Sequence, residues 1–274
     1  MCSCCGVGQR ERIRGWRKIA AAAWGVPNDP QIYGDLELDA TEVLGYMTSA
    51  RERAGVRVTM TTMVGRAIAG ALADNPDLNV RMYRGHFVRR ETVDVFFIVS
   101  AEQGAELSGV KVERADEKGA VEIARELESR ANAIRTGGDP ELGKTKKVIG
   151  STPRRLLGTS IRASSWLTTD RDMDLKRFGL PRQAFGSTII SSVGMFGVQR
   201  AYAPLANYYR IPFLLLVGEV AEKPVVLDGE IVARPMLTLT ATMDHRYIDG
   251  YHAARLARSV RAYFADPSAH EPTL

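Results

Sequence analysis

Residues 244–250 read Asp244-His245-Arg246-Tyr247-Ile248-Asp249-Gly250, and the hydrophobic pattern of the chain changes across them. The preceding run, 237–243, alternates apolar and threonine side chains, which is typical of a strand with one buried face. Apolar side chains then recur at helical spacing, at Ala253, Leu256, Ala257, Val260 and Phe264. We therefore place His245 on a short turn between the end of a strand and the start of a helix.

The aspartate and the glycine that close this stretch support the turn. Asp249 stands where the N-cap of the helix falls, and we expect a buried carboxylate that binds backbone N–H groups and pairs with a distant arginine. Gly250 follows it. A lone histidine at the end of a strand usually has a structural role, its ring satisfied by a neighbour. The complete seven-residue pattern favours catalysis by His245, because an imidazole titrates close to neutral pH.

The same residues resemble the DHRxxDG signature of the 2-oxoacid dehydrogenase acyltransferase family, the catalytic domain of dihydrolipoamide acyltransferases. Chloramphenicol acetyltransferase shares the shorter HxxxDG pattern, so other stretches must separate the two. Residues 187–198 resemble the family segment TFTISNLGMFGV, and residues 213–226 resemble its AILAVG…RPVV strand pair. Near the start, Arg17-Lys18-Ile19-Ala20 resembles the RKxIA opening of that domain. The resemblance extends from about residue 14 to residue 267 and favours the dihydrolipoamide branch.

The resemblance implies a mechanism and a site. His245 would act as general base on the thiol of coenzyme A or of a dihydrolipoyl group, and Ser191 would donate a hydrogen bond to the oxyanion of the tetrahedral intermediate. Without the histidine, Ser191 would be interpreted as a strand-end serine bonded to nearby backbone. Asp249 and Gly250 would support the histidine turn, with Arg17 as the candidate partner of the aspartate. In this family the active site lies between the subunits of a trimer, so a monomer would be inactive.

The composition is that of one large α/β domain. The chain has 274 residues, of which 45% are hydrophobic, enough to bury one sizeable core. Its net charge of +5 either favours phosphate-bearing or acidic partners or reflects only a solvated basic face, and the solvated face is the simpler interpretation. No basic block is dense enough to indicate nucleic acid binding, and no apolar stretch is long enough to span a membrane. No secretory signal is present either, so we expect a cytoplasmic protein.

The cysteines are confined to the start of the chain, at Cys2, Cys4 and Cys5. No histidine or second cysteine pair completes a zinc pattern around them, so we expect no metal. Lipidation of these cysteines is an alternative, but reduced thiols on a mobile end are the simpler expectation.

Periodicity predicts the remaining elements. Helices are predicted over 14–24, 41–54, 62–74 and 121–134, strands over 32–39, 93–100 and 211–217, and hairpins over 80–88 and 225–232. Strands interspersed with long helices indicate an α/β fold, a two-layer sandwich of a mixed β-sheet covered by helices, which is also the chloramphenicol-acetyltransferase-like fold that the resemblance implies. We expect a mobile segment over 1–13, the catalytic-type domain over 14–267 and a C-terminal tail over 268–274.

Three features differ from the family pattern. The lipoyl and subunit-binding domains of full-length relatives are missing from this sequence, so a lipoyl group or an acyl carrier protein would be supplied in trans. The loop expected after the strand 93–100, residues 103–110, does not resemble the usual DGLIVPVI. An insertion over about 144–182 carries several basic residues, and a helix is expected to start near Pro153. This insertion is either a lid or wall of the acyl pocket, or a contact for the phosphates of coenzyme A, or surface decoration.

These patterns favour an acyltransferase that moves an acyl group between coenzyme A and a thiol acceptor such as a dihydrolipoyl group. A non-catalytic trimeric core, the scaffold of a larger complex, is the alternative that the missing carrier domains and the altered loop support. A coenzyme A-dependent acyltransferase with a hydroxyl or amine acceptor is a third interpretation, because His245 suits each of these acceptors. The polar end 268–274 favours a homotrimer over a larger cage, in which a hydrophobic C-terminus docks on another trimer.

Overall fold

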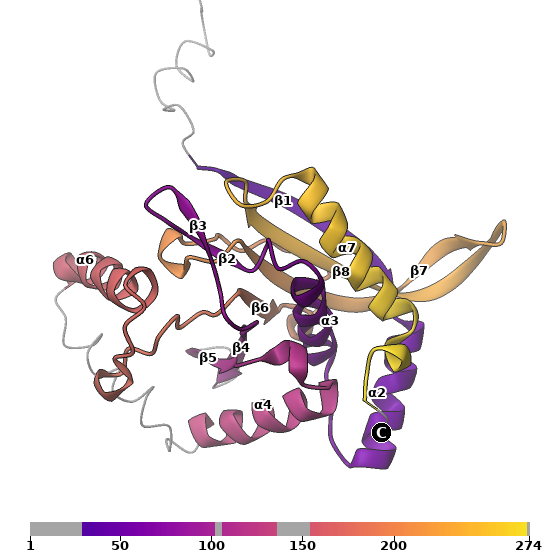
Figure 1. Ribbon diagram of the computed structural model, residues 1–274. Helices are drawn as coiled ribbons and strands as arrows, with labels where there is room; N and C mark the ends of the chain where they lie inside the picture. The colour runs from indigo at the N-terminus through magenta and orange to yellow at the C-terminus, as the bar shows by residue number, and fades with distance from the viewer. Residues whose placement is uncertain (1–28, 102–105, 136–153, 273–274) are drawn as a thin grey trace, which may run out of the picture. The chain divides into compact units, whose positions relative to one another are not determined.

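A six-stranded sheet forms the centre of the computed structural model (Figure 1), with its strands in the order β1-β8-β7-β6-β4-β5. The strands are β1 (Gln31–Asp39), β4 (Val95–Ala101), β5 (Glu106–Val112), β6 (Thr188–Ser192), β7 (Phe213–Leu227) and β8 (Glu230–Asp244). Strand β6 runs parallel to both β4 and β7, whereas the other neighbouring pairs are antiparallel. The predicted mixed sheet is confirmed.

The structure describes residues 29–101, 106–135 and 154–272. Arg17, the three cysteines and the helix predicted over 14–24 lie outside the described residues, as does the start of the predicted insertion. Within the described ranges, no helix is long and apolar enough to cross a membrane.

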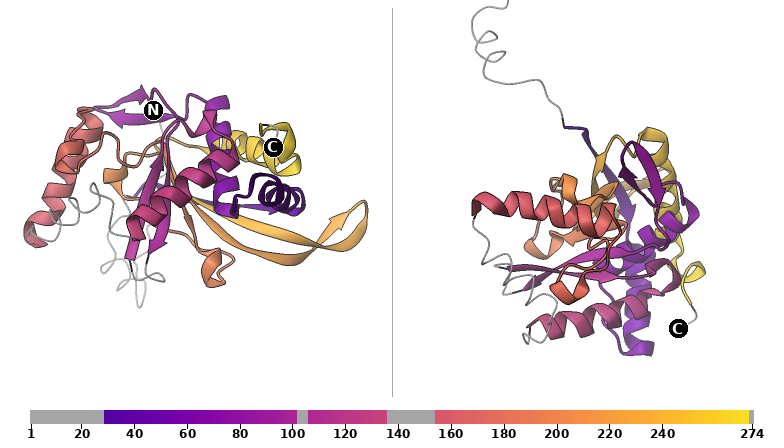
Figure 2. Two further views of the ribbon diagram at one scale, coloured as in Figure 1. Left: turned by 90° about the horizontal axis from the view of Figure 1, so that it is seen from below. Right: turned by 60° about the vertical axis from the view of Figure 1, so that its left-hand side comes forward.

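Helices cover one face of the sheet (Figures 1 and 2). They are α2 (Thr41–Ala54), α3 (Met60–Asp74), α4 (Ala120–Arg135) and α7 (Gly250–Ala265). Alternate residues of β7, such as Leu215 and Val217, point into the core beneath them. Helix α3 is the most deeply buried element of this layer, and its side chains Met63 and Leu72 are fully covered. Burial of each such side chain stabilises the fold by about 1.5–3 kcal/mol.

The opposite face of the sheet is covered differently. Its residues Ile189, Leu214 and Leu216 form a second, smaller core with Leu205 and Ile211, which belong to the mostly irregular segment that follows β6. The two-layer sandwich of sheet and helices is therefore confirmed, and a length of chain without long helices covers the second face.

Both predicted hairpins are present. Strands β2 (Val80–Tyr83) and β3 (His86–Arg89) form a separate two-stranded sheet, joined by Arg84 and Gly85 with φ of 49° and 78°. Strands β7 and β8 are joined by Asp228 and Gly229, with φ of 51° and 87°. Positive φ at both central residues is the mark of the turn that suits a twisted hairpin. The second hairpin is longer than predicted, and its end extends away from the helices (Figure 1).

The loop predicted over 103–110 is corrected in part, because residues 106–110 belong to strand β5, whereas residues 103–105 lie outside the described residues. This strand pairs antiparallel with β4, from Val95 opposite Val112 to Ala101 opposite Glu106. The alternation of buried Val110 and Val112 around Lys111 explains the strand, because one face of the sheet edge is covered. Gly109 fits there because a Cβ atom would lie 2.0 Å from the ring of Phe96.

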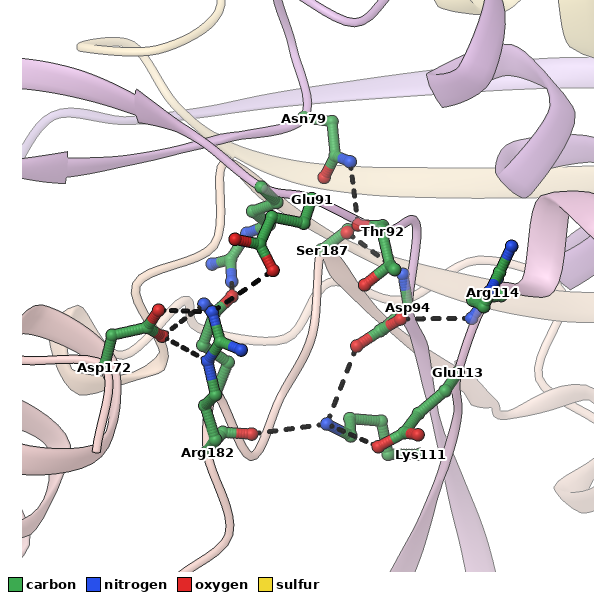
Figure 3. Close-up of polar contacts among 12 residues, drawn as sticks. Asn79, Glu91, Thr92, Asp94, Lys111, Glu113, Arg114, Asp172, Arg182 and Ser187 are labelled. Carbon is green, nitrogen blue, oxygen red and sulfur yellow. Dashed lines mark hydrogen bonds and ion pairs between the residues drawn. The ribbon is translucent and has the colours of Figure 1, made fainter. Parts of the chain in front are cut away.

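The predicted insertion contains a helix and is tied to the edge of the sheet. Helix α6 (Arg154–Ser165) begins at the residue after Pro153 and continues directly into a five-residue π-helix, η3 (Trp166–Asp170). Beyond it, Asp172 accepts hydrogen bonds from Arg182 Nε at 2.7 Å and from the Gln183 amide at 2.7 Å. Lys111 of β5 donates to the carbonyl of Arg182 at 3.2 Å (Figure 3).

The end of the chain packs into the helical layer through Glu271. Its side chain is 1% exposed and forms an ion pair with Arg66 at 3.3 Å. The same carboxylate accepts hydrogen bonds from the Tyr263 hydroxyl at 2.7 Å and from the backbone N–H of Ala120, at the start of α4, at 2.6 Å. One buried carboxylate of the predicted tail thus joins α3, α4 and α7.

Replacing Glu271 by alanine should lower the free energy of unfolding by about 3 kcal/mol, because it leaves the buried Arg66 charge and two donors without their acceptor. Glu271→Gln keeps an acceptor and should cost less. The control Glu128→Ala changes an exposed glutamate of α4 and should shift stability by less than about 0.5 kcal/mol. Urea unfolding measures all three; equal losses for Glu271→Ala and Glu128→Ala would contradict this role.

The Asp172–Arg182 pair should make stability depend on pH. The Arg182 guanidinium lowers the pKa of the Asp172 carboxyl below its ordinary value. A carboxyl with a lowered folded-state pKa contributes stability above its unfolded pKa of about 3.9 and loses it as the pH falls through the folded value. Asp172→Asn should therefore be less stable than the wild type at pH 7, and the gap should narrow below pH ~3.9. A gap of constant size in urea unfolding at both pH values would refute the linkage.

Candidate functional site

His245 lies where predicted, on the turn between the last residue of β8 and the first of α7. Its ring atom Nδ1 is 2.8 Å from the carbonyl oxygen of Ile248. A carbonyl can only accept, so Nδ1 carries the proton and Nε2 keeps a lone pair. Because His245 is exposed, its Nε2 atom is available to accept a proton.

The turn is fixed by Asp244, a role that the sequence analysis missed. The Asp244 side chain is 6% exposed and binds the guanidinium of Arg246 through both oxygens, at 2.5 to 3.1 Å. It also accepts from the backbone N–H of Arg246 at 3.0 Å, while its own carbonyl accepts from Tyr247 at 2.9 Å. The Tyr247 hydroxyl in turn accepts from the Met82 N–H at 2.9 Å, which ties the turn to β2.

Asp249 is the N-cap of α7, as predicted, but it is not buried. Its carboxylate accepts from the His252 N–H at 3.0 Å and lies 2.6 Å from His252 Nδ1, and its side chain is 54% exposed. The His252 N–H lowers the pKa of this carboxyl. A carboxylate that caps a helix binds backbone N–H groups of the first turn and can stay exposed to solvent. The predicted burial of Asp249 is therefore wrong. The expected partner of Asp249, Arg17, lies outside the described residues. At Gly250, a Cβ atom would meet nothing within 4 Å.

Ser191 is half-buried near the end of β6, and the backbone beyond it is held closely. The chain turns at Gly194, where a Cβ atom would lie 2.4 Å from the carbonyl oxygen of Gly218 in β7. The Val193 N–H donates to the carbonyl of Val217 at 3.0 Å. Gly194 thus allows the backbone that follows β6 to lie close against β7.

The register of the sheet separates Ser191 from His245 within one chain. Ser191 pairs with Leu216, and Leu216 pairs with Thr240 of β8. From Thr240 to Asp244 the strand advances four residues, or about 13 Å at roughly 3.3 Å per residue, and two strand spacings of about 4.8 Å add to this. The imidazole and the hydroxyl of one chain therefore do not face each other.

A cleft of about 340 Å³ lies beside the histidine turn. Asp244 and Arg246, which flank His245, line it, together with residues 82–85 of the first hairpin and residues of the segment 205–211. Trp166 and Asp170 of the predicted insertion form another part of its wall. The insertion is therefore more than surface decoration.

The charges around this cleft come from separate segments. Asp170 is paired with Arg210 at 3.1 Å, and the carbonyl of Asp170 accepts from buried Arg81 at 3.3 Å. Behind them, burial lowers the pKa of Arg90 to about 10. No spacing in the sequence joins these residues, which is why the sequence analysis missed them. Among the described residues, no group of three or more histidine, cysteine or acidic side chains is placed to hold a metal ion.

Known proteins resemble this chain over most of its length. The dihydrolipoyllysine-residue acetyltransferase component of the pyruvate dehydrogenase complex of Bacillus subtilis (strain 168) is 25% identical over 265 residues, which cover 94% of this chain and 50% of that protein. The chain thus spans about half the length of this curated relative.

Solved structures share the fold. Dihydrolipoamide acetyltransferase of Azotobacter vinelandii superposes with a TM-score of 0.65 at 22% identity, covering 96% of this chain and 94% of that chain. A chloramphenicol acetyltransferase superposes with a TM-score of 0.52 at 15% identity, covering 86% of this chain and 89% of that chain.

A family model also matches, over residues 8–139 and 178–270, and leaves residues 140–177 unmatched. The matched residues include both Ser191 and the turn that carries His245. The chain belongs to the 2-oxoacid dehydrogenases acyltransferase (catalytic domain) family.

Proposed function

We propose that this chain transfers an acyl group between coenzyme A and a thiol acceptor such as a dihydrolipoyl group. His245 is the general base and Ser191 the oxyanion donor, in an active site completed between the subunits of a trimer. The hydrogen bond from His245 Nδ1 to the carbonyl of Ile248 carries the proposal, because it leaves Nε2 as the proton acceptor.

The reaction needs one base and one hydrogen-bond donor. His245 Nε2 takes the proton of the attacking thiol, whose ordinary pKa of about 8.5 is within reach of an imidazole. The thiolate forms a C–S bond to the thioester carbonyl, and the Ser191 hydroxyl donates to the resulting oxyanion. The intermediate then expels the other thiolate, which recovers the proton from the imidazolium. No acyl-enzyme forms, and the histidine ends as it began.

The separation of the two residues supports a site between subunits. In one chain, His245 lies beyond the end of β8, whereas Ser191 lies at the level of Thr240. Each of the two residues therefore needs the other from a second chain. In a closed ring of identical chains, every histidine can meet the serine of a neighbour. The expected homotrimer provides this arrangement, and a larger cage would keep it.

The A. vinelandii relative supports the assignment. It was studied for the roles of a serine, a histidine and an asparagine in its catalytic mechanism, with the asparagine four residues after the histidine. In this chain, the residue four after His245 is Asp249, the N-cap of α7. An aspartate at this position keeps the capping hydrogen bond and adds a negative charge beside the turn.

Acyl exchange between acyl-CoAs of different chain length and dihydrolipoamide tests the proposal. His245→Ala should lower kcat by about 10²–10⁴-fold, as expected for the loss of a general base. Ser191→Ala should lower it by about 10²–10³-fold, as for the loss of one oxyanion donor.

Two matched controls separate chemistry from folding. Ser192→Ala removes the adjacent hydroxyl, which points to the other side of the strand, and should leave kcat nearly unchanged. His270→Ala removes an exposed histidine that has no role in the proposed mechanism, and should also leave kcat nearly unchanged. Equal kcat in His245→Ala and the wild type would refute the base. No exchange by the folded wild type with any acyl-CoA would instead favour the scaffold.

A further inference from the structure

One peptide group, between Ile248 and Asp249, links His245 to a second histidine, His252. Its carbonyl oxygen accepts a hydrogen bond from His245 Nδ1 at 2.8 Å, and its N–H donates a longer one to His252 Nδ1 at 3.4 Å. A peptide group is planar, so its carbonyl and its N–H turn together. A side chain that fixes the N–H of Asp249 therefore also fixes the carbonyl that keeps the proton of His245 on Nδ1.

The His252 ring can hold Asp249 whether or not its Nδ1 atom carries a proton. Nδ1 lies 2.6 Å from Asp249 Oδ1, and the His252 N–H donates to the same oxygen at 3.0 Å. A protonated Nδ1 donates to the carboxylate, and an unprotonated Nδ1 accepts from the Asp249 N–H. The His252 side chain is 29% exposed, so the surrounding protein restricts the ring.

Asp77 ties this arrangement to the segment that follows helix α3. Its carboxylate lies 4.0 Å from His252 Nε2 and accepts two hydrogen bonds from Arg255, at 2.7 and 3.0 Å. The hydrogen bonds from Arg255 lower the pKa of the Asp77 carboxyl, which therefore stays charged at neutral pH. A bidentate pair of this kind fixes geometry as well as adding energy. One carboxylate thus holds the first two turns of α7 in place.

The two ends of the histidine turn are held to different degrees. At the upstream end, the Asp244 side chain is 6% exposed and is bound closely to Arg246. At the downstream end, the Asp249 side chain is 54% exposed. The downstream end therefore depends more on its contacts with His252.

We propose that His252 and Asp77 are positioning residues for His245. Asp77 holds the start of α7, His252 holds the peptide group between residues 248 and 249, and the carbonyl of that group leaves Nε2 of His245 able to accept a proton. Neither residue touches the reacting thiol. The inference rests on the proposed function, because the tautomer of His245 affects catalysis only if His245 is the base.

Nitrogen-15 NMR of protein labelled at its histidine rings tests the inference without an activity assay, at a pH of about 8, where an ordinary imidazole is neutral. The chain has four histidines, so single substitutions assign each ring. The wild type should show the proton of His245 on Nδ1. His252→Ala and Asp77→Asn should each show it distributed over both ring nitrogens, because the carbonyl that binds Nδ1 is no longer fixed.

Acyl exchange gives a second readout. Both variants should lower kcat by about tenfold and leave KM nearly unchanged, because a displaced base loses its alignment with the thiol. Two matched controls should keep the wild-type tautomer and kcat. His86→Ala removes an exposed histidine of β3, and Asp74→Asn changes an exposed aspartate at the end of α3.

A His245 proton that stays on Nδ1 in both variants would overturn the inference. The two variants act on different segments, so misfolding of one leaves the other as the test. Exchange by the wild type with an unaltered tautomer in the variants refutes only the positioning role. An altered tautomer in the variants without any exchange by the wild type refutes only the acyl transfer.

Discussion

The site depends on the register of β8, which pairs with β1 on one side and with β7 on the other. A slip by one residue would turn Thr238 and Thr240 toward the helical core and take Leu237 and Leu239 out of it, so hydrophobic burial holds the register. The register places Asp244 at the end of the strand, where its carboxylate and carbonyl fold the next residues into the turn. His245 takes its position and its tautomer from that turn.

The same register keeps the two candidate catalytic residues of one chain apart. Strand β6 is short and ends at Ser192, whereas β8 continues past the level of Ser191 to Asp244. No rotation of a side chain closes a gap of about 13 Å along the strands. In the proposed function, each active site is therefore completed by a neighbouring chain. The described part of the insertion adds Trp166 and Asp170 to the wall of the cleft beside the turn.

Patterns within one segment could be predicted from the sequence, and contacts between segments could not. The strand before Asp244, the N-cap at Asp249 and the hairpin over 225–232 are local, and each is present as predicted. The resemblance to a family supplied Ser191 and the fold. Strand β5 was missed because its start differs from the family pattern, and the burial of Asp249 was expected from an arginine that lies outside the described residues. Asp170 and Arg210 meet only after the chain folds, so no spacing could indicate them.

Mixed oligomers test the central claim, that the histidine and the serine of one active site come from different chains. His245→Ala and Ser191→Ala chains, each inactive alone, would be refolded together at equal concentration, and acyl exchange measured. With random assembly in a trimer, one site in about four combines an intact histidine with an intact serine, so about a quarter of wild-type activity should return. Activity no higher than that of the separate variants, in oligomers shown to contain both chains, would contradict the account.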